Sequence, residues 1–101
     1  MPIWKRILMK IERGDLFLAD LDPTRGREIQ KTRPVLVVSN DIANEFSGLV
    51  TVAPLTSKNL DRIRAFEVPV PKLKGMSVPS KILIQQIRTL DKKRLFKKLA
   101  Q

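Results

Sequence analysis

The chain has 101 residues and carries 20 Lys and Arg against 10 Asp and Glu, so its formal net charge is +10. It contains no His and no Cys, which excludes a serine–histidine triad, a histidine-pair ribonuclease mechanism, a thiol nucleophile and a thiolate zinc site. A chain of this length forms one domain, and any catalysis must use Arg, Lys, Asp, Glu, Ser, Thr or a group of the substrate.

The positive charge is concentrated in the second half of the chain. Residues 1–50 hold eight basic and seven acidic side chains, whereas residues 51–101 hold twelve basic and three acidic ones. The densest basic run comprises Lys92, Lys93, Arg94, Lys97 and Lys98. Such a field favours a polyanionic partner such as nucleic acid, although a solvated surface explains a basic run taken alone equally well.

Residues 1–12 precede the first predicted strand, and we expect them to be an N-terminal extension of a single domain over residues 1–101. Their apolar residues recur at helical spacing, which predicts a short amphipathic helix or an extra strand. The longest apolar stretches of the chain have four or five residues, far fewer than the about twenty that a membrane-spanning helix needs. We therefore expect no membrane association and a cytoplasmic location.

Short apolar segments bounded by turn residues predict a series of strands. These segments are residues 16–21, 35–38, 49–55, 65–70 and 80–87. Pro69 favours an edge position for the fourth, because proline cannot donate a ladder hydrogen bond.

Two segments predict short helices. Ser39, Asn40 and Asp41 offer capping side chains before one or two turns over residues 42–46. Asp91 is a good N-cap for a closing helix, whose apolar stripe would be formed by Leu95, Phe96 and Leu99. Together the elements predict a mainly β (α+β) fold, a small and strongly bent antiparallel barrel with short helices, including a C-terminal helix.

The polar connection over residues 22–33 carries four basic residues and is a candidate functional surface, because loops on a rigid scaffold commonly carry function. Arg33 ends it, Glu28 lies five residues earlier, and Thr56 and Ser57 follow another strand. If strands 35–38 and 49–55 pair, these groups can converge at one rim.

RNA brings its own nucleophile, the 2′-OH, so a protein needs only to orient it and to stabilise the phosphoryl charge. A fixed Arg and a hydroxyl donor suffice for this in principle. From composition alone, the favoured interpretation is that Arg33 is a surface phosphate contact or a salt-bridge partner and that Thr56 caps a turn.

Metal and stacking sites have little support in the sequence. Asp20 and Asp22 can face one way, but basic residues and a proline surround them, so a solvated turn is favoured over a Mg²⁺ site. The five aromatic residues are expected mostly in the core, which disfavours a stacking platform for bases. We expect no metal and no cofactor.

Six short motifs occur in order along about residues 13–99. They are Arg13-Gly14-Asp15, Asp20-Leu21-Asp22-Pro23, Gly26-x-Glu28, Thr32-Arg33-Pro34-Val35-Leu36-Val37-Val38-Ser39-Asn40, Val52-Ala53-Pro54-Leu55-Thr56-Ser57, and Gln86-Ile87-Arg88-Thr89-Leu90-Asp91 with Arg94-Leu95. Together they resemble the MazF/PemK (Kid) family, the mRNA interferase toxins of bacterial type II toxin–antitoxin systems.

The resemblance implies an SH3-like barrel, a homodimer, an acidic MazE-like antitoxin as partner, and metal-independent cleavage of single-stranded RNA by 2′-OH attack. It assigns catalysis to Arg33 and Thr56, with Glu28 as a further catalytic residue. Gln85 occupies a position where several relatives carry an acidic residue. The RNA-binding candidates are Arg25, Arg27, Lys31, Thr32, Ser57, Lys58, Gln85 and Gln86.

Two other functions stay open at this stage. A non-catalytic gyrase poison on the same barrel would not need Arg33 and Thr56. A basic nucleic-acid-binding module would bind strongly and with high salt sensitivity, without cleavage.

Overall fold

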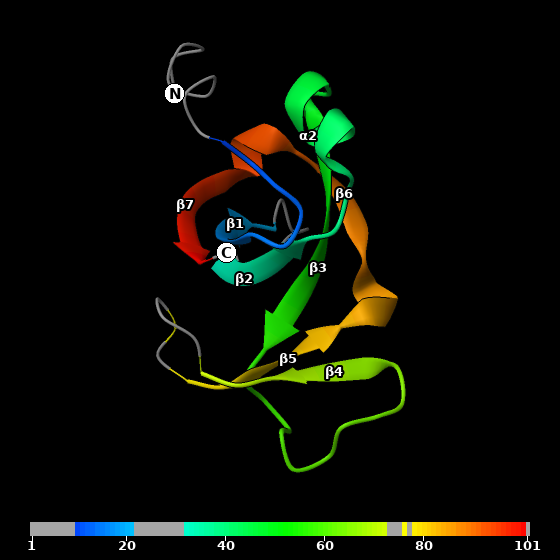
Figure 1. The fold of residues 1–101 in the computed structure, drawn as a ribbon. Coiled ribbons are helices and arrows are strands. Elements are labelled where there is room, and N and C mark those ends of the chain that lie inside the picture. The colour runs from blue at the N-terminus through cyan, green and yellow to red at the C-terminus, as the bar shows by residue number, and fades with distance from the viewer. Residues whose placement is uncertain (1–9, 22–31, 73–75, 77, 101) are drawn as a thin grey trace, which may run out of the picture.

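One antiparallel sheet dominates the computed structural model, which describes residues 10–21, 32–72, 76 and 78–100. Its strand order is β4-β5-β3-β2-β1-β7, and β6 also pairs with β3 (Figure 1). The elements are β1 (Leu16–Asp20), β2 (Thr32–Val37), α2 (Asp41–Phe46), β3 (Leu49–Thr56), β4 (Glu67–Val70), β5 (Ser80–Leu83), η1 (Ile84–Gln86), β6 (Arg88–Asp91), η2 (Lys92–Arg94) and β7 (Leu95–Ala100).

The central strands β1, β2 and β3 bury apolar side chains on both faces. Phe17 pairs with Val35 and Val37 pairs with Val52, and all four are almost completely buried in one cluster. Successive side chains of a strand point to opposite faces, so the alternate residues form a second cluster. That cluster contains Leu16, Ala53, Leu55 and Ile82, from strands β1, β3 and β5.

The predicted strand over residues 80–87 is divided in the structure. Leu55 of β3 pairs with Ile82, whereas Val52 pairs with Arg88. Between these two pairs β3 advances by three positions and the partner segment by six, and the three-residue turn η1 takes up the difference. The division bends this edge of β3 and separates the β4–β5 hairpin from β6 (Figure 1).

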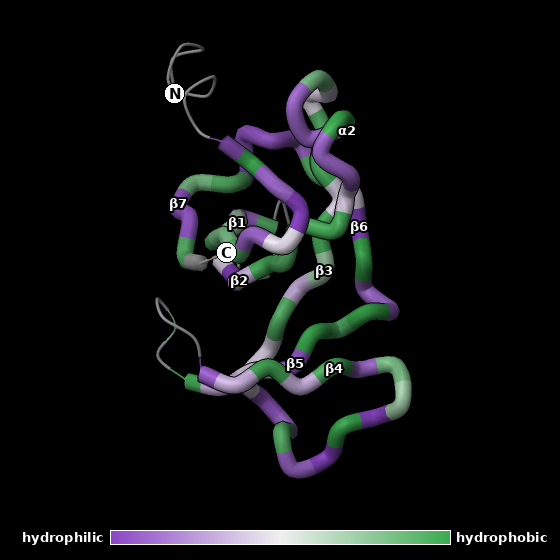
Figure 2. Tube along the Cα trace, viewed as in Figure 1, coloured by the Kyte–Doolittle hydropathy of each residue, from purple (hydrophilic) through white to green (hydrophobic). Residues whose placement is uncertain are grey.

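The predicted C-terminal helix is wrong. Asp91 does act as a cap, since its side chain accepts from the Lys93 N–H at 2.8 Å, but the turn that it caps is the short η2. The following residues form strand β7, which pairs with β1 from Leu95 to Ala100. Pairing satisfies the otherwise free edge of β1 and buries Leu95, so tertiary pairing overrides the local helical spacing. Figure 2 shows the hydrophilic stretch between the hydrophobic ends of β7.

The predicted short helix is confirmed as α2. Asn40 is its N-cap and accepts from the Ala43 N–H at 2.8 Å. Asp41 accepts from the Arg13 N–H at 2.7 Å and from the Asn44 side chain at 3.2 Å, and these two bonds hold the pKa of the Asp41 carboxyl below its ordinary value. The helix is thereby tied to the turn before β1, where Gly14 adopts a φ of +94° that favours glycine.

The edge position predicted for residues 65–70 is confirmed, because β4 ends the strand order and carries Pro69. The described residues contain no pairing between β6 and β7, the two strands that would close a barrel of β6, β3, β2, β1 and β7. The structure therefore confirms a mainly β antiparallel fold with one short α-helix in the described part of the chain. Residues 1–9 of the predicted extension lie outside the described residues.

Candidate functional site

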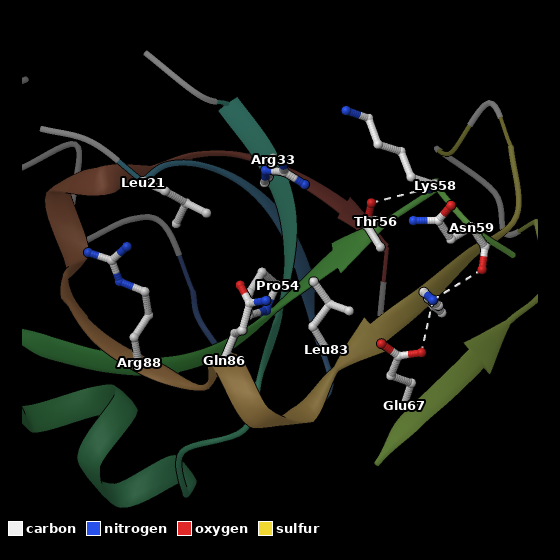
Figure 3. A pocket seen from close by; sticks show the side chains of 11 residues that line it. Leu21, Arg33, Pro54, Thr56, Lys58, Asn59, Glu67, Leu83, Gln86 and Arg88 are labelled. Atoms are coloured by element: carbon white, nitrogen blue, oxygen red, sulfur yellow. Dashed lines mark hydrogen bonds and ion pairs between the residues drawn. The ribbon is translucent and has the colours of Figure 1, made fainter. Parts of the chain in front are cut away.

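The pairing of β2 with β3 brings Arg33 and Thr56 together. The ladder pairs Val35 with Pro54, and Arg33 and Thr56 each lie two residues beyond this pair, one on each strand. Alternate residues share a face of the sheet, and directly opposed side chains on paired strands are neighbours. Arg33 and Thr56 therefore lie close together, as expected if these two strands pair. They lie where β2 begins and β3 ends (Figure 3).

Arg33 and Thr56 line both of two neighbouring clefts and form the wall that separates them. The first cleft has a volume of about 340 Å³ and is lined by Leu21, Arg33, Pro54, Thr56, Lys58, Asn59, Glu67, Lys81, Leu83, Gln86 and Arg88. The second cleft, of about 510 Å³, is lined by Leu18, Thr32, Arg33, Pro34, Leu55, Thr56, Ser57, Lys58, Met76, Val78, Ser80, Lys97 and Leu99. The two clefts share three polar residues, Arg33, Thr56 and Lys58.

The donor groups of Arg33 and Thr56 are available to a ligand. The Thr56 hydroxyl oxygen accepts from the Lys58 N–H at 3.2 Å, and this bond leaves the hydroxyl hydrogen free to donate. Within residues 10–21, 32–72, 76 and 78–100, no carboxylate or carbonyl accepts from the half-buried Arg33 guanidinium. A planar cation and a hydroxyl donor therefore face the same space, which suits a phosphate group.

Both clefts are electropositive. The first cleft has four cationic side chains and one carboxylate, and the second has three cationic side chains and no carboxylate. Clefts lined by one sign of charge focus the field and raise the local concentration of an oppositely charged ligand. The arrangement suits a polyanion that crosses Arg33 and Thr56 and places one phosphate in each of the two clefts.

Glu67, the one carboxylate of the first cleft, is paired with Lys81. Lys81 Nζ lies 2.8 Å from Glu67 Oε1, and both side chains are largely buried. The backbone N–H of Arg64, 3.0 Å from Glu67 Oε1, and the Lys81 ammonium hold the pKa of Glu67 below its ordinary value. Glu67 therefore stays ionised at neutral pH, and the ion pair is lost only as the pH falls through that lowered pKa.

The other predicted site residues fall into three groups. Thr32 and Ser57 line the second cleft, Lys58 lines both clefts, and Gln86 lines the first. Gln85 is exposed and lines neither cleft. The remaining predicted residues lie outside the described residues, and these are Arg25, Arg27, Glu28 and Lys31.

Sequence reasoning missed four polar residues of the first cleft, namely Asn59, Glu67, Lys81 and Arg88. Lys81 had a detectable signal, because a lysine inside a short apolar strand requires a buried partner. Glu67 could have been proposed as that partner, since it lies diagonally across the β4–β5 ladder from Lys81. Asn59 had no such signal, because its place depends on the path of a loop.

The described residues contain no group of three or more His, Cys, Asp or Glu side chains placed so that they could hold a metal ion. They also contain no helix with the length and apolarity required to cross a membrane.

Comparison with known proteins identifies the family. A family model for PemK-like, MazF-like toxins of type II toxin–antitoxin systems matches residues 12–101. The chain belongs to this family. The match covers all of the motifs on which the resemblance was based.

Solved structures agree with this assignment. MazF from Deinococcus radiodurans is 31% identical, with a TM-score of 0.73 over 92% of this chain and 82% of that chain. The Mycobacterium tuberculosis toxin MazF-mt6 is 29% identical, with a TM-score of 0.71 over 86% of this chain and 78% of that chain. MazF in the D. radiodurans MazE–MazF complex is 30% identical, with a TM-score of 0.73 over 92% and 81% of the two chains.

Proposed function

We propose that this PemK/MazF-family toxin is an endoribonuclease that cleaves single-stranded RNA without a metal ion or cofactor. The observation that carries the proposal is the pair of available donors, the Arg33 guanidinium and the Thr56 hydroxyl, on the wall shared by two electropositive clefts. The chain has no His and no Cys, so the nucleophile that fits is the 2′-OH of the substrate.

In the proposed step, the 2′-oxygen attacks the adjacent phosphorus and the bond from phosphorus to the 5′-oxygen breaks. The products are a 2′,3′-cyclic phosphate and a 5′-hydroxyl. Arg33 neutralises the charge that develops on the phosphoryl oxygens, and Thr56 donates a hydrogen bond to one of them. Glu28 is the candidate base for the proton of the 2′-OH, and the leaving 5′-oxygen takes up a proton from solvent water.

The remaining polar residues of the two clefts would hold the substrate on either side of the scissile phosphate. Lys58, Gln86 and Arg88 border the first cleft, and Thr32 and Ser57 border the second. The unstacked bases of single-stranded RNA are read by hydrogen bonds to their edges and by stacking on aromatic or Arg side chains. We assign the same role to the exposed Gln85 and to Arg25, Arg27 and Lys31, which precede β2 in the sequence.

The proposal includes an acidic antitoxin, a homodimeric state and a cytoplasmic location. An antitoxin partner is supported by the MazE–MazF complex of D. radiodurans and by the net charge of +10, which complements an acidic chain. We further infer that β6, β3, β2, β1 and β7 form an SH3-like barrel that closes at η2, since η2 joins its two end strands.

The direct test is incubation of the purified protein with a mixed-sequence RNA in EDTA. The wild-type chain should cut the RNA and leave cyclic phosphate ends. Thr56→Val, which replaces the hydroxyl by a methyl group, should lower kcat by about 10²-fold. Intact RNA with the wild-type chain, or equal cutting by the variant, contradicts the proposal.

Two outcomes of this assay would favour the alternative functions. Tight and salt-sensitive binding of RNA without cleavage indicates a nucleic-acid-binding module. Inhibition of gyrase in a supercoiling assay, with RNA left intact, indicates a gyrase poison.

A further inference from the structure

Lys81 is a buried cation that the proposed cleavage step does not use. Only 4% of the residue is exposed, although it lies beside a cleft that opens to solvent. Burying an ammonium group is unfavourable unless the group is paired and hydrogen-bonded. Each of its three N–H groups has an acceptor. Lys81 Nζ donates to Asn59 O at 3.1 Å, to Arg62 O at 3.0 Å and to Glu67 Oε1 at 2.8 Å.

Two of these acceptors belong to the loop of residues 57–66, which joins β3 to β4 and contains no strand or helix. Asn59 has a φ of +56°, in the left-handed region that Asn tolerates better than most residues. Glu67, at the end of the loop, accepts both from Lys81 and from the Arg64 N–H. Lys81 and Glu67 thus bind the loop at Asn59, Arg62 and Arg64.

The anchored loop forms part of the wall of the first cleft. Lys58 and Asn59 line this cleft, and the Lys58 N–H donates to the Thr56 hydroxyl. Thr56 itself is held by the sheet, where it pairs directly with Lys81 on β5. The bonds made by Lys81 and Glu67 therefore anchor the loop residues that line the first cleft, whereas strands β2 and β3 position Arg33 and Thr56.

We propose that Lys81 is a positioning residue that, with Glu67, fixes residues 57–66 as a wall of the RNA cleft and sets the place of Lys58 and Asn59 against the substrate. The role in RNA binding rests on the proposed function, whereas the anchoring of the loop is a property of the fold alone. Because Arg33 and Thr56 are carried by strands β2 and β3, loss of Lys81 should weaken substrate binding more than it slows the chemical step.

Limited tryptic digestion of the folded chain tests the anchor, because Arg62 and Arg64 provide tryptic sites in the loop. Lys81→Met keeps an unbranched side chain and removes all three hydrogen bonds. The initial rate of cleavage after Arg62 and Arg64 should rise about tenfold, because the loop opens locally more often. Lys72→Met, which removes an exposed lysine that lines neither cleft, is the matched control and should digest like the wild type.

Lys81→Met leaves the Glu67 carboxylate without its cationic partner. The double variant Lys81→Met with Glu67→Gln also removes that charge. It replaces Lys81→Met in the digestion experiment if the single variant does not fold. Cleavage of the loop at the wild-type rate in a folded variant overturns the anchor.

RNA-cleavage kinetics test the positioning role. For Lys81→Met we expect KM to rise about tenfold while kcat stays within about threefold of the wild type. A smaller folded fraction alone would lower the apparent kcat and leave KM unchanged, so an unchanged KM overturns the positioning role. If the wild-type chain does not cut RNA, the proposed function fails, and the tryptic rates still decide whether Lys81 holds the loop.

Discussion

Replacing Arg33 with alanine should lower kcat for RNA cleavage by about 10²- to 10³-fold, the loss typical of removing one preorganised charge stabiliser. Arg33 is half-buried at the start of β2 and borders both clefts. Its guanidinium has no acceptor in the described part of the chain. Its removal should therefore change the free energy of unfolding by less than about 0.5 kcal/mol, as for most surface substitutions.

Two further variants separate geometry from charge. Arg33→Lys keeps the positive charge but loses the planar fork, so its kcat should fall between those of the wild type and Arg33→Ala. Arg64→Ala removes one positive charge from an exposed arginine that lines neither cleft, and its kcat should stay within about threefold of the wild type. Equal losses in Arg33→Ala and Arg64→Ala would reduce the role of Arg33 to general attraction of a polyanion.

The largest expected effect on stability is that of Phe17→Ala, at about 3–5 kcal/mol in the free energy of unfolding. Phe17 has no exposed surface and lies in the cluster with Val35, Val37 and Val52. Its truncation removes apolar contacts and leaves a cavity in a close-packed interior. Since small domains have a total stability of about 5–15 kcal/mol, urea unfolding should show a much lower midpoint.

Phe96→Ala is the matched control, because Phe96 lies on β7 and half of it is exposed. The same change of side chain should cost less than about 1 kcal/mol there. Similar losses at the two positions would mean that the cluster around Phe17 is not the core of the fold.

Strands β1 to β5 could be predicted from the sequence because each contains a short apolar segment next to turn residues, whereas the mostly polar β6 was not predicted. The C-terminal segment shows the limit of that method. Leu95, Phe96 and Leu99 have helical spacing, but Leu95 is buried and Phe96 is half-exposed because residues 95–100 pair with β1. No local pattern reports that β1 has a free edge, so the strand could not be distinguished from a helix.

In the site too, part of the arrangement could be predicted from local sequence and part depends on tertiary contacts. Arg33 and Thr56 each stand at a strand end, and the pairing of β2 with β3 was sufficient to place them together. The environment of Lys81 depends on carbonyl groups of a loop about twenty residues away in the sequence. Those contacts arise from the path of the whole chain, and residue types alone do not encode them.

The central claim is that the substrate supplies the nucleophile and that the protein supplies only charge and orientation. A short RNA with one 2′-deoxy nucleotide on the 5′ side of the cleaved bond tests this claim most directly. The account predicts that the wild-type protein cuts the unmodified RNA to a cyclic phosphate and leaves the modified bond intact. Cleavage of the 2′-deoxy bond at the same rate would contradict it, because the attacking oxygen would then have to come from water or from the protein.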